Sequence, residues 1–111
     1  MLAEAWPGWT SSSPVAGPAA AAAKLWRMSE AWVYLLRCRD GSLYTGWTVD
    51  VERRLARHRA GVASRYTASR LPVDLELALP MPDRTAARRE EARIKRLSRA
   101  QKLALVKAAA P

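Results

Sequence analysis

The stretch 32-WVYLLRCRDGSLYTGWT-48 decides the fold, because it holds two strand-like segments joined by an Asp-Gly turn. The first segment, residues 31–38, is apolar on both faces, which is typical of a central strand. It carries Tyr34, and the second segment, residues 43–47, carries Tyr44. Whether the two tyrosines lie on one face of the sheet depends on the length of the turn between them.

The Asp-Gly turn allows two registers. A two-residue loop would pair Arg39 with Ser42 and place the tyrosines on opposite faces, because a slip of one residue turns every side chain over. A three-residue loop that ends in a left-handed glycine would pair Cys38 with Ser42 and bring both phenols to one face. The sequence alone does not choose between the two registers. Gly46 is an indication for the second, because it would then leave room opposite Tyr34. We predict the Cys38–Ser42 pair and a shared site.

A helix and a loop are expected after this hairpin. Asp50 is a suitable N-cap for a helix over residues 51–60. The residues expected on its apolar stripe are Val51, Leu55 and Val62. Residues 61–72 are basic and polar, which predicts a connector without regular structure.

A third strand and two further helices complete the predicted order. Alternation over residues 73–79 predicts a half-solvated edge strand. The residues expected on its apolar face are Val73, Leu75, Leu77 and Leu79. Asp83 can cap a helix over about 84–97, and an S-x-x-Q capping box at Ser98 predicts another over 99–108. The order β-β-α-β-α-α predicts an α+β fold, a small three-stranded sheet flanked by three helices.

The positive charge of the chain is concentrated after residue 30. The 111 residues carry a formal charge of +9, and residues 31–111 contribute all of it, with 17 basic and 8 acidic residues. A domain this basic attracts polyanions, so DNA is the expected partner and RNA is not excluded. Residues 1–29 are rich in proline, serine and alanine. This composition predicts a disordered extension before a domain over 30–108.

The counts of special residues exclude several classes of protein. One cysteine, Cys38, and one histidine, His58, exclude an internal disulfide and a Cys- or His-rich metal centre. No apolar run reaches the length of about 18 residues that a membrane helix needs, and the N-terminus does not resemble a signal peptide. We therefore expect a cytoplasmic monomer that makes no contact with membranes.

The hairpin motifs resemble those of the GIY-YIG nuclease superfamily, in its small single-domain bacterial members. Trp32-Val33-Tyr34 stands where the family has Gly-Ile-Tyr, and Tyr44-Thr45-Gly46 stands where it has Tyr-Ile-Gly. Many members have a lysine at the position of Trp47. These departures predict a weaker or differently tuned nuclease.

Two helical motifs extend the resemblance over roughly residues 32–107. In 51-VERRLARH-58, Arg54 precedes a leucine, as the family's helical arginine precedes a large apolar residue, and His58 lies one turn further on. In 91-EARIKRLSR-99, Glu91 stands where the family has a metal-binding glutamate. The four motifs occur in the family order and at the family spacing.

The resemblance implies a metal-dependent endonuclease that hydrolyses DNA phosphodiester bonds, with structure-selective or weakly sequence-selective cleavage and a role in repair or recombination. Tyr44 would orient or deprotonate a water if its pKa were lowered, with Tyr34 assisting. Arg54 would offer a planar donor fork to the phosphate, and His58 would contact the phosphate or Tyr44. A single Mg²⁺ or Mn²⁺ on Glu91 would stabilise the leaving oxygen.

A further set of residues is expected to contact nucleic acid: Gly46, Arg53, Arg57, Arg65 and Arg70. The alternative class is a non-catalytic nucleic-acid-binding module with the same fold. Each candidate also has an ordinary structural interpretation: sheet aromatics for the tyrosines, a solvated helix position for Arg54 and a polar helix flank for His58. Glu91 could serve as an i,i+4 partner of Lys95.

Overall fold

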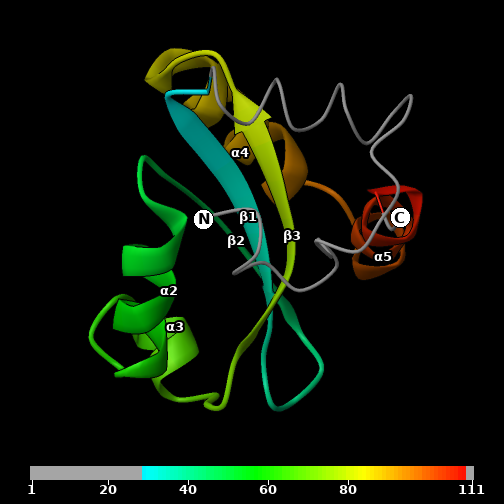
Figure 1. Cartoon of the computed structure of the whole chain (residues 1–111). Helices are drawn as coiled ribbons and strands as arrows, with labels where there is room; N and C mark the ends of the chain where they lie inside the picture. Colours follow the sequence, from blue (N-terminus) through cyan, green and yellow to red (C-terminus); the bar gives the residue numbers. More distant parts are fainter. Residues whose placement is uncertain (1–28, 110–111) are drawn as a thin grey trace, which may run out of the picture.

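The three strands are antiparallel and lie in the order β2-β1-β3, in a computed structural model that describes residues 29–109 (Figure 1). They span Ala31–Arg37 (β1), Leu43–Thr48 (β2) and Asp74–Met81 (β3). The first six residues of β1 are all buried. This confirms the predicted α+β class, the central position of the first strand and the edge position of the third. The extension predicted over residues 1–29 lies, except for Ser29, outside the described residues.

Four helices accompany the sheet in the part of the chain that the structure describes. They are α2 (Val51–Arg59), α3 (Arg65–Ala68), α4 (Arg84–Lys95) and α5 (Arg99–Ala109). The short helix α3 corrects the prediction of an irregular connector over 61–72. None of the helices in 29–109 is long and apolar enough to cross a membrane.

The predicted helix starts are confirmed by their hydrogen bonds. The carboxylate of Asp50 accepts from the backbone N–H of Arg53 at 3.0 Å, and Asp83 caps α4 in the same way at 2.8 Å. The capping box at α5 makes both of its reciprocal hydrogen bonds. Ser98 Oγ accepts from the Gln101 N–H at 3.1 Å, and Gln101 Oε1 accepts from the Ser98 N–H at 2.9 Å. Each cap satisfies backbone donors that the first turn leaves unpaired.

The predicted hairpin register is confirmed. Tyr34 pairs with Gly46, and Leu36 pairs with Tyr44. The N–H of Cys38 donates to the carbonyl of Ser42 at 2.9 Å, and the last loop residue, a glycine, has a left-handed φ of 84°. The three-residue loop therefore places both tyrosines on one face of the sheet.

Apolar side chains form a separate core on each face of the sheet. One core contains alternate residues of β1, including Tyr34 and Leu36, with Val51 and Leu55 of α2. The other contains the remaining β1 residues with apolar side chains of α4 and α5. Figure 1 accordingly shows α2 and α5 on opposite sides of the sheet. Val62 does not belong to the apolar stripe of α2 as predicted, because it follows the C-terminal glycine turn and is 60% exposed.

The apolar residues of β3 do not share one face, which corrects the predicted alternation. Leu36 pairs with Leu75 and Leu35 pairs with Leu77, so Glu76 is an extra residue between two consecutive pairs. A bulge of this kind shifts the side-chain alternation by one residue. Val73 and Leu75 therefore pack in the core under α2, whereas Leu77 and Leu79 pack in the core under α4 and α5.

Candidate active site

Tyr34 lies directly over Gly46. A Cβ placed on Gly46 would be 2.5 Å from Tyr34 Oη and 2.6 Å from its Cζ, so only glycine leaves space for this ring. Gly46 is buried, and its contact with nucleic acid stays a prediction. Tyr44 lies on the same face, with its ring centroid 6.4 Å from that of Tyr34.

The hydroxyl of Tyr34 meets two side chains of α2. His58 Nε2 lies 2.8 Å from Tyr34 Oη, and Arg54 Nε donates to the same oxygen at 3.4 Å. The imidazole also packs edge-on against Tyr44, with the ring centroids 5.2 Å apart. The four residues predicted as catalytic are thus brought together, because i and i+4 on α2 share a helix face. His58 is fully buried between the two rings, so it is not a polar tip on the helix flank.

Burial sets the protonation of this cluster. It raises the pKa of Tyr34 to about 12, although the hydrogen bond from Arg54 acts in the opposite direction. Burial, followed by the positive charge of Arg54, lowers the pKa of His58 to about 4. At neutral pH the site therefore holds a neutral phenol and a neutral imidazole. Tyr34, the predicted assistant of Tyr44, is therefore not ionised at this pH.

Glu91 lies on α4, which packs against β2 and β1. Its side chain is 20% exposed and pairs with Lys95 Nζ at 3.5 Å. The charge of Glu91 also makes a small contribution to the raised pKa of Tyr34, which associates this carboxylate with the tyrosine site. The neighbouring Glu90 instead forms two hydrogen bonds to Arg93, at 2.9 and 2.7 Å.

The available metal donors are few. Within residues 29–109, no group of three or more His, Cys, Asp or Glu side chains is arranged to hold a metal ion. A single carboxylate such as Glu91 suits Mg²⁺, which is commonly held by one or two carboxylates, several waters and a substrate phosphate. This donor set fits the predicted Mg²⁺ or Mn²⁺, with Glu91 as its protein ligand.

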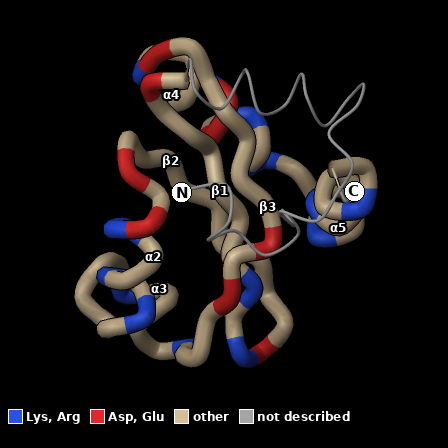
Figure 2. Tube along the Cα trace, viewed as in Figure 1, with Lys and Arg blue, Asp and Glu red and all other residues tan. Residues whose placement is uncertain are grey.

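Three of the predicted DNA-contacting arginines are exposed near the site. Arg53 and Arg57 lie on α2 and Arg65 on α3, and none of them forms an ion pair with another described residue. Figure 2 shows the corresponding basic segments along α2 and α3. These guanidinium groups are therefore available to phosphates.

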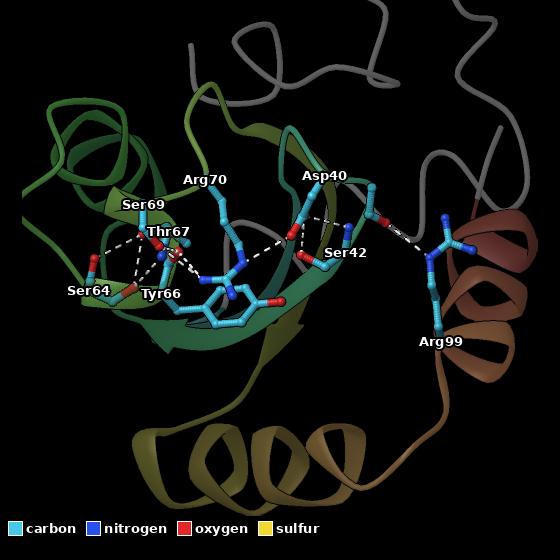
Figure 3. A network of polar contacts seen from close by, with 9 residues as sticks. Asp40, Ser42, Ser64, Tyr66, Thr67, Ser69, Arg70 and Arg99 are labelled. Atoms are coloured by element: carbon cyan, nitrogen blue, oxygen red, sulfur yellow. Dashed lines mark hydrogen bonds and ion pairs between the residues drawn. The ribbon is translucent and has the colours of Figure 1, made fainter.

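Arg70 differs from these arginines because its side chain is engaged within the protein. Its Nε donates to Asp40 Oδ2 at 3.0 Å, and its guanidinium carbon lies 3.7 Å from the ring centroid of Tyr66 (Figure 3). Tyr66 in turn stacks on Tyr44, with the centroids 5.9 Å apart. We call Asp40, Arg70 and Tyr66 the clasp. It joins the hairpin loop to α3 and packs against Tyr44.

Sequence reasoning missed two polar residues at the site, Ser64 and Thr67. The hydroxyl oxygen of Thr67 lies 2.8 Å from His58 Nδ1 and 2.9 Å from Ser64 Oγ. The S-x-x-T spacing was a usable N-cap signal for α3, because Ser64 Oγ accepts from the backbone N–H of Thr67. Nothing in the sequence, however, indicated that α3 packs against α2.

Comparison with known proteins gives consistent matches over this domain. The family model described as the GIY-YIG catalytic domain matches residues 30–104. A UPF0213 protein of Halobacterium salinarum is 51% identical over 73 residues, which cover 66% of this chain and 95% of the relative. A UPF0213 protein of Streptococcus sanguinis is 47% identical over 79 residues, which cover 71% and 91%. The solution NMR structure of a Bacillus halodurans UPF0213 protein is 41% identical and covers 72% of this chain and 85% of that chain, with a TM-score of 0.49.

Proposed function

The chain belongs to the GIY-YIG catalytic domain family, and from this premise we propose that it is an endonuclease that hydrolyses DNA phosphodiester bonds with one Mg²⁺ or Mn²⁺ ion. The observation that carries the proposal is the convergence of Tyr34, His58 and Arg54 on one hydroxyl group over Gly46, with Tyr44 beside them. A plain sheet aromatic would not need a glycine beneath it and two polar partners at its end.

Arg54 is proposed to bind the scissile phosphate. Its Nε is directed to Tyr34 Oη, while its two terminal nitrogens make no hydrogen bond to other described residues. A planar guanidinium fixed at one nitrogen can present the other two to a phosphate as a fork. The contact to Tyr34 would then hold this fork beside the attacking water.

The two tyrosines are proposed to orient that water. Tyr34 is neutral at physiological pH, so it acts as a positioned hydrogen-bonding group rather than as a phenolate base. Tyr44 is only partly buried, so it can reach a substrate that lies over the sheet. The metal on Glu91 would supply Lewis-acid stabilisation of the leaving oxygen when bound.

The basic surface supports binding to the DNA backbone. Arg53, Arg57 and Arg65 lie on the two helices that border the tyrosine site, and phosphate contacts fix position without reading sequence. We therefore propose structure-selective or weakly sequence-selective cleavage, with a role in DNA repair or recombination. A cytoplasmic monomer is the proposed working form.

The second candidate is a non-catalytic nucleic-acid-binding module. The observation that favours it is the ion pair of Glu91 with Lys95 Nζ at 3.5 Å, which gives the proposed metal ligand an ordinary structural role. Such a module would keep salt-sensitive DNA binding and would lack cleavage in Mg²⁺ or Mn²⁺.

A cleavage panel with branched, flapped and single-stranded DNA tests the proposal. The informative pair is Glu91→Ala with Glu90→Ala as the matched control, because the two carboxylates are adjacent on α4 and only the Glu91 charge contributes to the pKa of Tyr34. We expect Glu91→Ala and Tyr44→Phe to abolish metal-dependent nicking while DNA binding at low salt remains. Binding without cleavage by the wild-type protein would instead identify the non-catalytic module.

A further inference from the structure

A chain of buried polar groups continues from the tyrosine site into α3. Tyr34 Oη contacts His58 Nε2, and His58 Nδ1 contacts the hydroxyl of Thr67, both at 2.8 Å. Thr67 and His58 are each 0% exposed and Tyr34 is 2% exposed. Ser64 Oγ lies 2.9 Å beyond the Thr67 hydroxyl, at the start of α3 (Figure 3).

Counting the protons in this chain selects one tautomer of the imidazole. Arg54 Nε can only donate, so Tyr34 Oη accepts from it. If His58 carried its proton on Nε2, that N–H would also donate to Tyr34 Oη. The phenol proton would then have no acceptor among the described residues, which is costly for a hydroxyl group this deeply buried.

The other tautomer satisfies every group. With the proton on Nδ1, His58 donates to Thr67 Oγ1, and Nε2 accepts from the Tyr34 hydroxyl. Thr67 can then donate its own proton to the backbone carbonyl of Ser64, which lies 3.4 Å away. Each donor has an acceptor and no donor faces another donor.

We propose that Thr67, held in place by Ser64, is a positioning residue that fixes the Nδ1–H tautomer of His58 and so makes Tyr34 a donor to this imidazole. The catalytic consequence rests on the proposed nuclease function. In this tautomer Tyr34 Oη accepts from Arg54 only, which leaves a second lone pair for the attacking water once DNA binding brings that water to the site. In the other tautomer Arg54 and His58 would occupy both lone pairs.

The backbone around Thr67 is fixed from two sides. Ser64 Oγ accepts from the Thr67 N–H at 3.1 Å, and the Thr67 carbonyl accepts from the Arg70 N–H at 3.0 Å. The carbonyl of Arg70 accepts in turn from the N–H of Arg39 in the hairpin loop at 2.9 Å. The hairpin that carries both tyrosines therefore also restrains the helix that orients His58.

The test uses the one histidine of the chain as its own probe. Long-range proton–nitrogen NMR spectra of the uniformly ¹⁵N-labelled full-length protein report which imidazole nitrogen is protonated, without DNA or metal. We compare the wild type with Thr67→Val, which removes the hydroxyl, and with Thr67→Ser, which keeps it. Thr85→Val, at an exposed position of α4, is the matched control for the change from threonine to valine.

We expect the Nδ1–H form in the wild type, Thr67→Ser and Thr85→Val, and a mixture with the Nε2–H form in Thr67→Val. Nicking by Thr67→Val should fall about tenfold, by analogy with the 10- to 100-fold losses when the partner that orients a metal-binding histidine is removed. DNA binding at low salt should not change. An Nε2–H imidazole in the wild type, or a Thr67→Val tautomer identical to that of the wild type, would overturn the inference.

The two proposals fail separately. A wild-type protein that shows the expected tautomers and never nicks DNA refutes the nuclease and leaves the hydrogen-bond chain in place. A protein that nicks DNA with His58 in the Nε2–H form refutes the role of Thr67 alone. If Thr67→Val does not fold, the wild-type spectrum still decides the tautomer.

Discussion

Replacing Gly46 by alanine tests the geometry on which the site depends. The added Cβ would lie 2.5 Å from Tyr34 Oη, where an ordinary contact begins at 3.4 Å, so the oxygen must move by about 0.9 Å. Tyr34 cannot move away easily, because the residue is 2% exposed and its hydroxyl is held by His58. The substitution therefore displaces the phenol from its hydrogen-bond partner.

The effect on stability follows from overpacking. Added atoms in a filled core cost about 1–3 kcal/mol, and the reduced freedom of the unfolded chain offsets about 0.4–1 kcal/mol of that. We expect the free energy of unfolding of Gly46→Ala to fall by about 1–2 kcal/mol. For a domain of this size, that loss lowers the melting temperature by about 4–16 °C.

The effect on cleavage should be larger than the effect on stability. A displacement of about 1 Å at a reacting group can reduce the rate about 100-fold. Plasmid nicking is measured below the melting temperature of the variant, with Tyr34→Phe as the comparison that removes the hydroxyl without a collision. Because both changes remove the same oxygen from the site, the double variant should lose little more activity than either single variant.

A Gly46→Ala protein with wild-type melting and wild-type nicking would refute this geometry of the site. The geometry is also refuted if the losses of Gly46→Ala and Tyr34→Phe multiply in the double variant, because the two changes would then act on different parts of the site. DNA binding at low salt serves as the control for folding, since the exposed arginines on α2 and α3 are not in contact with Gly46.

Three further predictions concern the charged groups. The pKa of His58 is about 4 in the folded protein and ordinarily 6.5, so the unfolded chain binds this proton first. The stabilisation by neutral His58 is complete above pH 6.5, and up to about 3 kcal/mol of it is lost as the pH falls toward 4. Urea unfolding of the wild type and of His58→Gln measures this loss, and the contribution from His58 should be present only in the wild type. Arg54→Lys should reduce nicking about 10- to 100-fold through loss of a charge-assisted hydrogen bond, whereas equal losses in Arg54→Lys and the control Arg53→Lys would contradict a specific phosphate contact. Replacing Arg53, Arg57 or Arg65 by alanine should reduce the salt slope of DNA binding by about 1. Arg70→Ala should change that slope less, because Asp40 already neutralises Arg70. Fluorescence anisotropy at several salt concentrations measures the difference. An equal change for Arg70→Ala would contradict the neutralisation of Arg70 within the clasp.

The parts of the fold that the sequence predicts correctly depend on neighbouring residues. The caps at Asp50, Asp83 and Ser98 each satisfy donors within three residues, so their signals are complete in the sequence. The hairpin register depends on one turn and on the fit of Gly46 to Tyr34 across it. The caps are therefore predictable from spacing alone, whereas the turn permits two registers and only the fit of Gly46 to Tyr34 favours the observed one.

The parts that the sequence does not predict depend on contacts between distant elements. The alternation over β3 is regular in sequence, yet pairing with β1 inserts a bulge at Glu76, whose carboxylate meets Arg37 at 2.7 Å. Helix α3 has four residues, too few to show a helical period. Its contacts with the site, Thr67 to His58 and Tyr66 to Tyr44, exist only after α2 and α3 pack together.

The neutrality of Tyr34 and His58 determines which groups could stabilise charge during the proposed phosphodiester hydrolysis. Burial fixes the geometry of the pair and also keeps both groups un-ionised, so neither can offset negative charge that develops on the phosphoryl oxygens. In the proposed mechanism, that task falls to Arg54 and to the metal at Glu91. Orientation and charge stabilisation are thereby assigned to different residues. Loss of the Tyr34 hydroxyl and loss of its position should then be equivalent in their effect on rate. Loss of Arg54 also removes charge stabilisation and should cost more than either of them, but the combined losses should be less than additive because Arg54 is bonded to the same oxygen.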